Sequence, residues 1–83
     1  MIVSGRVQAV WFRESCRQRA AAEGVAGWVR NNPDGTVEAV VEGDGSAVER
    51  MVAWMGDGPP MALVTRVEVR AEQPIGEQGF AIR

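Results

Sequence analysis

Residues 4–13 are the part of the sequence whose residue types and spacing could perform chemistry. They read Ser-Gly-Arg-Val-Gln-Ala-Val-Trp-Phe-Arg and lie between a predicted strand and the start of a predicted helix. Backbone N–H groups at a helix N-terminus have no intrahelical partner, and the helix dipole is positive there. A loop over such an end can hold an anion with main-chain amides, and Arg13 would add a planar fork of donors that matches phosphate or carboxylate. The alternative is that this segment only connects a strand to a helix.

The distribution of charge fits an anion site in the same segment. Residues 1–13 contain Arg6 and Arg13 and no acid, while the other seventy residues carry seven arginines and eleven acids. A net charge of −2 argues against nucleic-acid binding by the chain as a whole. A positive corner on an acidic protein can still attract a small anion, although two arginines in thirteen residues can also arise by chance.

The residue types exclude most other catalytic sites. The chain has no histidine and one cysteine, so it offers no Ser-His or Cys-His pair and no zinc or haem site. It has no nucleotide P-loop, and Ala22 stands where a Cys-x5-Arg loop starting at Cys16 would need arginine. We interpret Cys16 as a small core residue and Asp44 as a turn acid. The pairs Glu38/Glu42 and Glu68/Glu72 are interpreted as a solvated face. We expect no metal and no cofactor.

Hydrophobic periodicity and turn residues predict a single α+β domain over residues 1–83. The predicted elements are a strand at 1–4, a helix from 12 to Gly24, strands at 26–31 and 36–42, a helix at 46–55, a strand at 63–70 and a short strand at 79–82. The order β-α-β-β-α-β plus a tail indicates a ferredoxin-like sandwich, an antiparallel sheet with two helices on one face.

Finer details of the predicted elements follow from local patterns. Phe12, Cys16 and Ala20 share one face of the first helix. Ser46 and Glu49 form a predicted capping box for the second helix, which is expected to bury Val48, Met51, Val52 and Met55. In the strand at 63–70, Leu63, Thr65, Val67 and Val69 are expected to face one side and the residues between them the other. Asn31 shares parity with Val29 and falls at a strand end beside the turn made by Pro33 and Gly35.

Three separate segments of the sequence resemble the acylphosphatase family. They are Gly-Arg-Val-Gln-Ala-Val-Trp-Phe-Arg at 5–13, Gly-Trp-Val-Arg-Asn at 27–31 and Pro-Asp-Gly-Thr-Val at 33–37, and the resemblance extends to Phe-Ala-Ile-Arg at 80–83. It implies a small ferredoxin-like enzyme that hydrolyses the carboxyl–phosphate anhydride of acyl phosphates without metal or cofactor. By similarity, Arg13 would pair with the phosphoryl oxygens and Asn31 would orient the attacking water. Main-chain amides would hold the phosphoryl group along Gly5, Arg6, Val7, Gln8, Ala9, Val10 and Trp11.

This resemblance implies a mechanism without an obvious general base. Arginine stays protonated in proteins and asparagine cannot take a proton, so the phosphate or the leaving carboxylate would accept it. Two departures from the family are visible. Ala9 stands where the family usually has glycine and would cost roughly 1–2 kcal/mol in a left-handed conformation. Only four residues precede Gly5, which predicts a less stable first strand or a chain that begins upstream.

Other interpretations remain open from the sequence. An RNA-recognition domain has the same element order but needs exposed aromatic residues on its third strand, and 36–42 contains none. An acylphosphatase-like domain of a larger carbamoyl-transfer enzyme of hydrogenase maturation is the second alternative. Trp11 could rim the site or pack, and Trp28 and Trp54 are interpreted as packing residues.

The expected partners and setting follow from these interpretations. The expected substrate is an acyl phosphate, with inorganic phosphate as product and competitor. The longest stretch without charge is the eight residues 58–65, so we expect no membrane span. A cytoplasmic monomer is expected, and nine arginines without a lysine suggest a bacterial origin.

Overall fold

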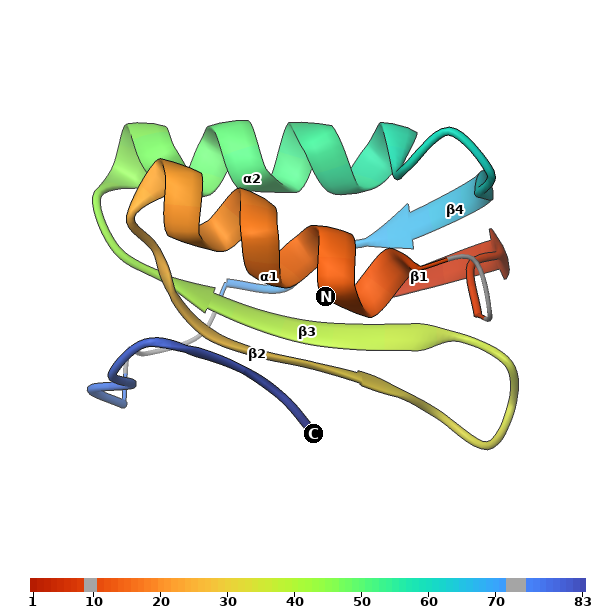
Figure 1. Ribbon diagram of the computed structural model, residues 1–83, viewed down its shortest axis with the longest axis horizontal. Coiled ribbons are helices and arrows are strands. Elements are labelled where there is room, and N and C mark those ends of the chain that lie inside the picture. Colours follow the sequence, from red (N-terminus) through yellow and green to blue (C-terminus); the bar gives the residue numbers. More distant parts are fainter. Residues whose placement is uncertain (9–10, 72–74) are drawn as a thin grey trace.

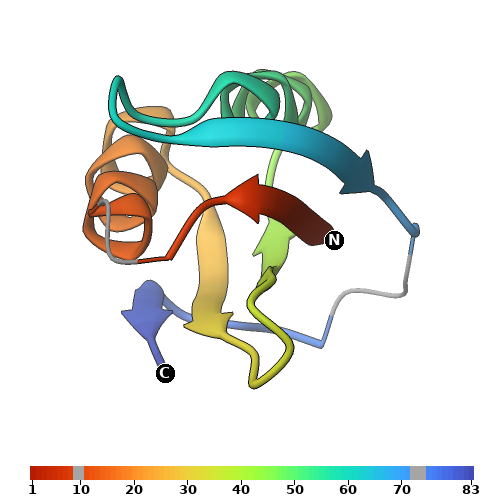
Figure 2. The same cartoon turned by 90° about the vertical axis from the view of Figure 1, so that its right-hand side faces the viewer.

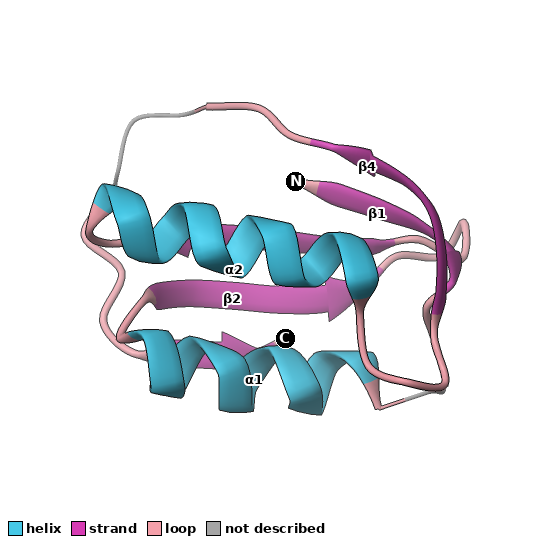
Figure 3. Ribbon diagram, turned by 90° about the horizontal axis from the view of Figure 1, so that it is seen from above, coloured by secondary structure: helices cyan, strands magenta, loops and turns pink. Residues whose placement is uncertain are grey.

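The computed structural model describes residues 1–8, 11–71 and 75–83. Its elements are β1 (Ile2–Arg6), α1 (Phe12–Glu23), β2 (Ala26–Asn31), β3 (Val37–Glu42), α2 (Gly45–Asp57), β4 (Leu63–Glu68) and β5 (Phe80–Ile82). The strands form one sheet in the order β4-β1-β3-β2-β5, antiparallel except for the parallel pair β2 and β5. Both helices lie on the same face of this sheet (Figure 1, Figure 3), which confirms the predicted ferredoxin-like fold.

The core lies between the two helices and the covered face of the sheet. Helix α1 buries Phe12, Cys16 and Ala20, as their spacing of four residues predicts. Helix α2 buries Ala47, Met51 and Met55, whereas the predicted core residues Val48 and Val52 are only half-buried. The sheet contributes Val3, Val29, Val37 and Ala39. None of the described helices is both long and apolar enough to span a membrane.

The start of α2 differs from the predicted capping box. The helix begins at Gly45 with Asp44 as its N-cap residue, so Ser46 already lies inside the first turn. The Ser46 hydroxyl donates a hydrogen bond to Asp44 Oδ2 at 2.6 Å, and the N-cap residue Asp44 makes no side-chain cap hydrogen bond. The capping-box prediction was wrong because the pattern Ser-x-x-Glu was aligned two residues too far along the chain.

The predicted alternation in β4 was also wrong, because the pairing with β1 contains a bulge. Ser4 pairs with Arg66 and Gly5 with Val64, which leaves Thr65 without a partner in the register. One extra residue reverses the phase of a strand. Val64 and Val67 therefore both pack on the core although they are three residues apart. Strand β1 also continues to Arg6, two residues beyond the predicted end, and β4 ends at Glu68.

Of the four acids predicted to form a solvated face, three have polar partners, and the fourth, Glu72, lies outside the described residues. Glu68 pairs with Arg66 at 2.7 Å on the surface. Glu42 accepts the backbone N–H groups of Ile75 at 2.8 Å and Glu77 at 2.9 Å, and Glu38 pairs with Arg30 at 2.9 Å. The Glu42 contacts hold the segment that precedes β5 against the end of β3. A carboxylate with two backbone donors forms charge-assisted hydrogen bonds, which are stronger than neutral ones.

The segment after β1 is linked to the β2–β3 turn by one side chain. Gln8 Nε2 donates to the carbonyl oxygens of Asn32 and Thr36, each at 2.9 Å. The turn is closed by Asn32 N–H to the Thr36 carbonyl at 2.9 Å. The end of β1, the start of α1 and this turn gather at one end of the molecule, which faces the viewer in Figure 2.

Replacing Gly5 by alanine should destabilise the fold by about 3 kcal/mol or more. Gly5 has φ 121°, and a Cβ there would lie 2.1 Å from the Leu63 carbonyl oxygen. Gly45→Ala is the matched control, because a Cβ at Gly45 meets nothing within 4 Å and alanine favours the helix. Urea unfolding followed by tryptophan fluorescence measures both. A Gly5→Ala loss below about 1 kcal/mol would contradict the bulge geometry.

Replacing Gln8 by alanine should lower the free energy of unfolding by about 1–3 kcal/mol, since two hydrogen bonds to carbonyl oxygens disappear. Gln18→Ala serves as the control, because Gln18 is exposed and its only contact among the described residues is a 3.4 Å hydrogen bond to Glu14. Its unfolding free energy should change by less than about 0.5 kcal/mol. Similar losses of unfolding free energy in the two variants would show that the Gln8 hydrogen bonds to the β2–β3 turn do not stabilise the fold.

Candidate functional site

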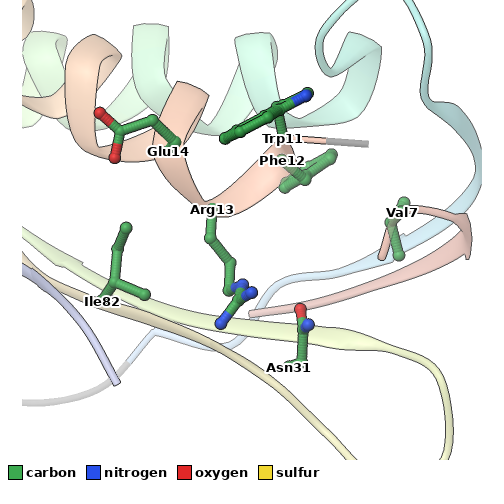
Figure 4. Close-up of a pocket in the computed structure, with 7 residues that line it drawn as sticks. All are labelled: Val7, Trp11, Phe12, Arg13, Glu14, Asn31 and Ile82. Atoms are coloured by element: carbon green, nitrogen blue, oxygen red, sulfur yellow. The ribbon is translucent and has the colours of Figure 1, made fainter. Parts of the chain in front are cut away.

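A pocket of about 480 Å³ opens between the N-terminus of α1 and the ends of β2 and β5. The residues that line it are Val7, Trp11, Phe12, Arg13, Glu14, Asn31 and Ile82 (Figure 4). Four of them, namely Val7, Trp11, Arg13 and Asn31, belong to the site predicted from the sequence. The structure therefore brings together the predicted arginine and the predicted asparagine, which are far apart along the chain.

The N-terminus of α1 leaves backbone donors available in this pocket. Trp11 is the N-cap residue, and the first helical bond runs from the Ser15 N–H to the Trp11 carbonyl at 2.9 Å. The N–H groups of Phe12, Arg13 and Glu14 have no intrahelical acceptor, and no side chain caps them in the described part of the chain. Three oriented donors at the positive end of a helix dipole form a site suited to an anion.

Arg13 adds a full positive charge to these amides. Its side chain extends from the first turn of α1 toward Asn31 (Figure 4). Across residues 1–8, 11–71 and 75–83, Arg13 forms no ion pair, whereas Arg17 one turn later is paired with Glu14. A guanidinium without a carboxylate partner beside free backbone amides attracts an anion with two or more oxygens.

The side-chain oxygen of Asn31 is a hydrogen-bond acceptor without a donor among the described residues. It is the last residue of β2 and pairs in register with Val37 of β3, at the strand end that the sequence pattern predicts. The Asn31 Oδ1 atom is buried and has no hydrogen-bond partner among the described residues. Because buried polar atoms are nearly always satisfied, this oxygen is suited to accept a hydrogen bond from water or a ligand in the pocket.

Glu14 lines the pocket, but its carboxylate is engaged elsewhere. Arg17 Nε donates to Glu14 Oε2 at 3.0 Å, Arg17 Nη2 binds Oε1, and Gln18 Nε2 approaches Oε1 at 3.4 Å. The hydrogen bond from Arg17 is the main reason that the pKa of Glu14 lies below its ordinary value. In Figure 4 the carboxylate points away from Arg13 and Asn31. An ionised acid of lowered pKa is a weak proton acceptor.

The other candidate nucleophile lies outside the pocket. Cys16 is buried on the inner face of α1, and burial raises the pKa of its thiol to about 12. A thiol with that pKa stays protonated near neutrality and is a poor nucleophile. This agrees with the interpretation of Cys16 as a core residue.

The remaining predicted site residues lie in different places. Gly5 and Arg6 belong to β1 and do not line the pocket, and Gln8 binds the β2–β3 turn through its side chain. Ala9 and Val10 fall outside the described residues, so the predicted effect of Ala9 stays a prediction. The left-handed backbone occurs at Trp11, with φ 62° and ψ 22°.

Ile82 is a pocket residue that sequence reasoning missed. It lies on β5, where it pairs in parallel register with Val29, and the next N–H, of Arg83, donates to the Val29 carbonyl at 2.8 Å. A short apolar strand at the end of a chain gives no signal of which edge it joins. The pairing of β5 with β2 therefore could not be predicted from the sequence.

Comparisons with known proteins agree on one family. A family model described as acylphosphatase matches residues 1–82. An acylphosphatase of Thermococcus kodakarensis is 56% identical over 80 residues, which cover 96% of this chain and 88% of the relative. The crystal structure of acylphosphatase from Bacillus subtilis superposes with a TM-score of 0.94 at 37% identity, covering 99% of this chain and 92% of that chain. The crystal structure of T. kodakarensis HypF has a TM-score of 0.85 at 31% identity and covers all of this chain but only 12% of that one.

The similarity to acylphosphatases extends over nearly the full length of this chain, and it includes the segments that form the pocket. Acylphosphatase activity and an acyl phosphate substrate follow from it. The chain belongs to the acylphosphatase family.

Proposed function

We propose that this chain hydrolyses acyl phosphates with the phosphoryl group held at the N-terminus of α1 and a water molecule held by Asn31. The observation that supports this most directly is that one pocket holds a guanidinium and an amide oxygen, neither of which has a partner among the described residues. Arg13 binds an anion, and Asn31 Oδ1 accepts a hydrogen bond. Together they fit a phosphoryl group and an attacking water.

The phosphoryl group binds through backbone amides and Arg13. The free N–H groups of the first turn of α1 and the guanidinium face the same pocket, so they share the phosphoryl oxygens. These preorganised donors stabilise the negative charge of the phosphoryl oxygens in the transition state, hold the phosphorus in place and reduce the electrostatic repulsion between the phosphoryl group and the nucleophile. Of the predicted backbone donors, Val7, Gln8 and Trp11 are suited to bind the phosphoryl group, and the same role stays a prediction for Ala9 and Val10, which lie outside the described residues. Gly5 and Arg6 are less suited, because both are paired to β4.

The reaction is a displacement at phosphorus. The water oxygen forms a bond to phosphorus, the bond from phosphorus to the acyl oxygen breaks, and the bonding pair leaves with the carboxylate. The proton of the water passes to a phosphate oxygen or to the leaving carboxylate. Asn31 takes no proton and contributes alignment, which alone is worth several orders of magnitude in rate when the geometry is correct.

No side chain of the described pocket lining is suited to act as general base. Glu14 is the only carboxylate among the lining residues, and it is bound by Arg17 with a lowered pKa. An acyl phosphate is an activated anhydride with a good leaving group, so charge stabilisation and alignment suffice. We therefore propose that catalysis requires neither metal nor cofactor.

A second candidate is a domain that processes carbamoyl phosphate within a larger enzyme. The match to one eighth of the much longer HypF chain favours it, because it shows this fold as part of another protein. The two candidates differ in substrate. A free-standing acylphosphatase hydrolyses simple acyl phosphates, whereas a carbamoyl-specific domain prefers carbamoyl phosphate.

Hydrolysis of benzoyl phosphate, followed by its ultraviolet absorbance, tests the proposal. The assay contains EDTA, and inorganic phosphate is titrated as a competitor. We expect activity that resists the chelator and is competitively inhibited by phosphate. Hydrolysis of carbamoyl phosphate alone would favour the second candidate, and loss of activity in EDTA would overturn the metal-free mechanism.

Arg13→Ala should lower kcat/KM for benzoyl phosphate by about two orders of magnitude or more, the scale for removal of one key charge-stabilising donor. Arg50→Ala is the matched control, because Arg50 is an exposed arginine on α2 that pairs with Glu23 away from the pocket. Its kcat/KM should stay within about twofold of the wild-type value. A change of less than about threefold in Arg13→Ala would reject the role of this arginine.

Asn31→Ala should reduce kcat by about two orders of magnitude and leave the inhibition constant of inorganic phosphate within about threefold, because water alignment is lost while the anion site remains. Asn32→Ala controls for the turn, since Asn32 Nδ2 binds Thr36 Oγ1 at 3.1 Å and its side chain does not line the pocket. Weaker phosphate binding with unchanged kcat would contradict the assignment of Asn31 to the water.

A further inference from the structure

We propose that Trp11 and Ile82 form an apolar lip that binds the acyl group, so that the preferred substrates carry an aromatic or branched acyl chain. This inference rests on the proposed function and adds to it a substrate class and a specificity-determining residue. Trp11 lies on the helix side of the pocket and Ile82 on the sheet side (Figure 4).

Trp11 contributes little to packing in the free protein. Its side chain is 79% exposed. The other two tryptophans are used by the fold: Trp28 is 9% exposed beneath the guanidinium groups of Arg30 and Arg83, and Trp54 packs on Phe12 with ring centroids 6.0 Å apart. A large apolar side chain that is left in solvent at the edge of a pocket is available to a ligand.

The backbone of Trp11 is held in an unfavourable conformation. With φ 62° and ψ 22° it is the only non-glycine residue with positive φ in the described part of the chain. A bulky side chain in the left-handed region is disfavoured where glycine is not. Such outliers gather at functional sites, where the surrounding structure holds them. Here the start of α1 holds Trp11 and keeps its indole at the pocket.

The pocket has a polar part and an apolar part. Arg13 and Asn31 form the polar part, where the phosphoryl group and water bind. Val7 and Phe12 are fully buried and serve as walls, whereas Trp11 and Ile82, at 79% and 40% exposed, have surface left to bury. A volume of about 480 Å³ lies in the range of pockets that enclose a whole small molecule. Space therefore remains for the acyl group.

The apolar surfaces of Trp11 and Ile82 favour one kind of acyl group. A flat aromatic acyl group can stack on the indole and displace water from both apolar surfaces. A methyl group is too small to cover either residue.

The test compares kcat/KM for benzoyl phosphate and acetyl phosphate in the wild type and in Trp11→Gly, Trp11→Phe and Val69→Ala. We expect Trp11→Gly to lower kcat/KM for benzoyl phosphate about tenfold more than for acetyl phosphate, mainly through KM. Trp11→Phe should retain at least a third of the wild-type value for benzoyl phosphate. Val69 is the control, because it is 60% exposed and does not line the pocket, and its variant should match the wild type for both substrates.

Two further readouts separate specificity from folding. In Trp11→Gly the inhibition constant of inorganic phosphate should rise less than the KM for benzoyl phosphate, because glycine keeps the backbone N–H of residue 11 and removes only the indole. The melting temperature of this variant should equal or exceed that of the wild type, because glycine adopts positive φ without steric strain. An equal loss for benzoyl and acetyl phosphate would overturn this inference alone. A wild type that hydrolyses neither substrate would overturn the proposed function.

Discussion

An anion site at the N-terminus of α1 requires that no carboxylate of the protein already neutralises the positive end of the helix. The N-cap residues of the two helices differ in this respect. Helix α2 begins after Asp44, whose carboxylate lies at the helix start and is bound by the Ser46 hydroxyl. Helix α1 begins after Trp11, which has no acceptor to offer, and the one acid of its first turn, Glu14, is bound by Arg17. The positive end of α1 thus has no carboxylate at its N-cap position, whereas that of α2 has one.

Alignment of the two sides of the pocket depends on contacts that are distant in sequence. Gln8 joins the segment before α1 to the turn after Asn31, and pairing of β5 with β2 brings Ile82 to the same opening. A site without a general base relies on the position of water relative to phosphorus, so small displacements reduce its rate strongly. The side-chain amide of Gln8 therefore fixes the relative position of helix and hairpin without touching the reacting atoms.

Much of the fold could be predicted from local patterns, because spacing and turn residues act over a few positions. The buried face of α1 and the hairpin around Pro33 are examples. Two features could not be predicted: the bulge that leaves Thr65 unpaired and the position of β5 beside β2. Both depend on strand pairing between segments that are distant in sequence. For the site, residue types predicted the anion cluster around Arg13. The family resemblance, and not the residue types, assigned Asn31 to the same site. That Ile82 lines the pocket was not predicted.

Within residues 1–8, 11–71 and 75–83, three groups of the pocket are left without a partner: the exposed indole of Trp11, the Asn31 Oδ1 atom and the Arg13 guanidinium. A chain of 83 residues buries a limited fraction of its surface and has a modest free energy of unfolding to set against the left-handed backbone of Trp11 and the buried oxygen of Asn31. Each of the three groups matches a different part of one substrate with its water: an apolar acyl group, a hydrogen-bond donor and an anion. Their concurrence in one pocket is therefore better explained by binding of that complex than by three independent defects of the fold.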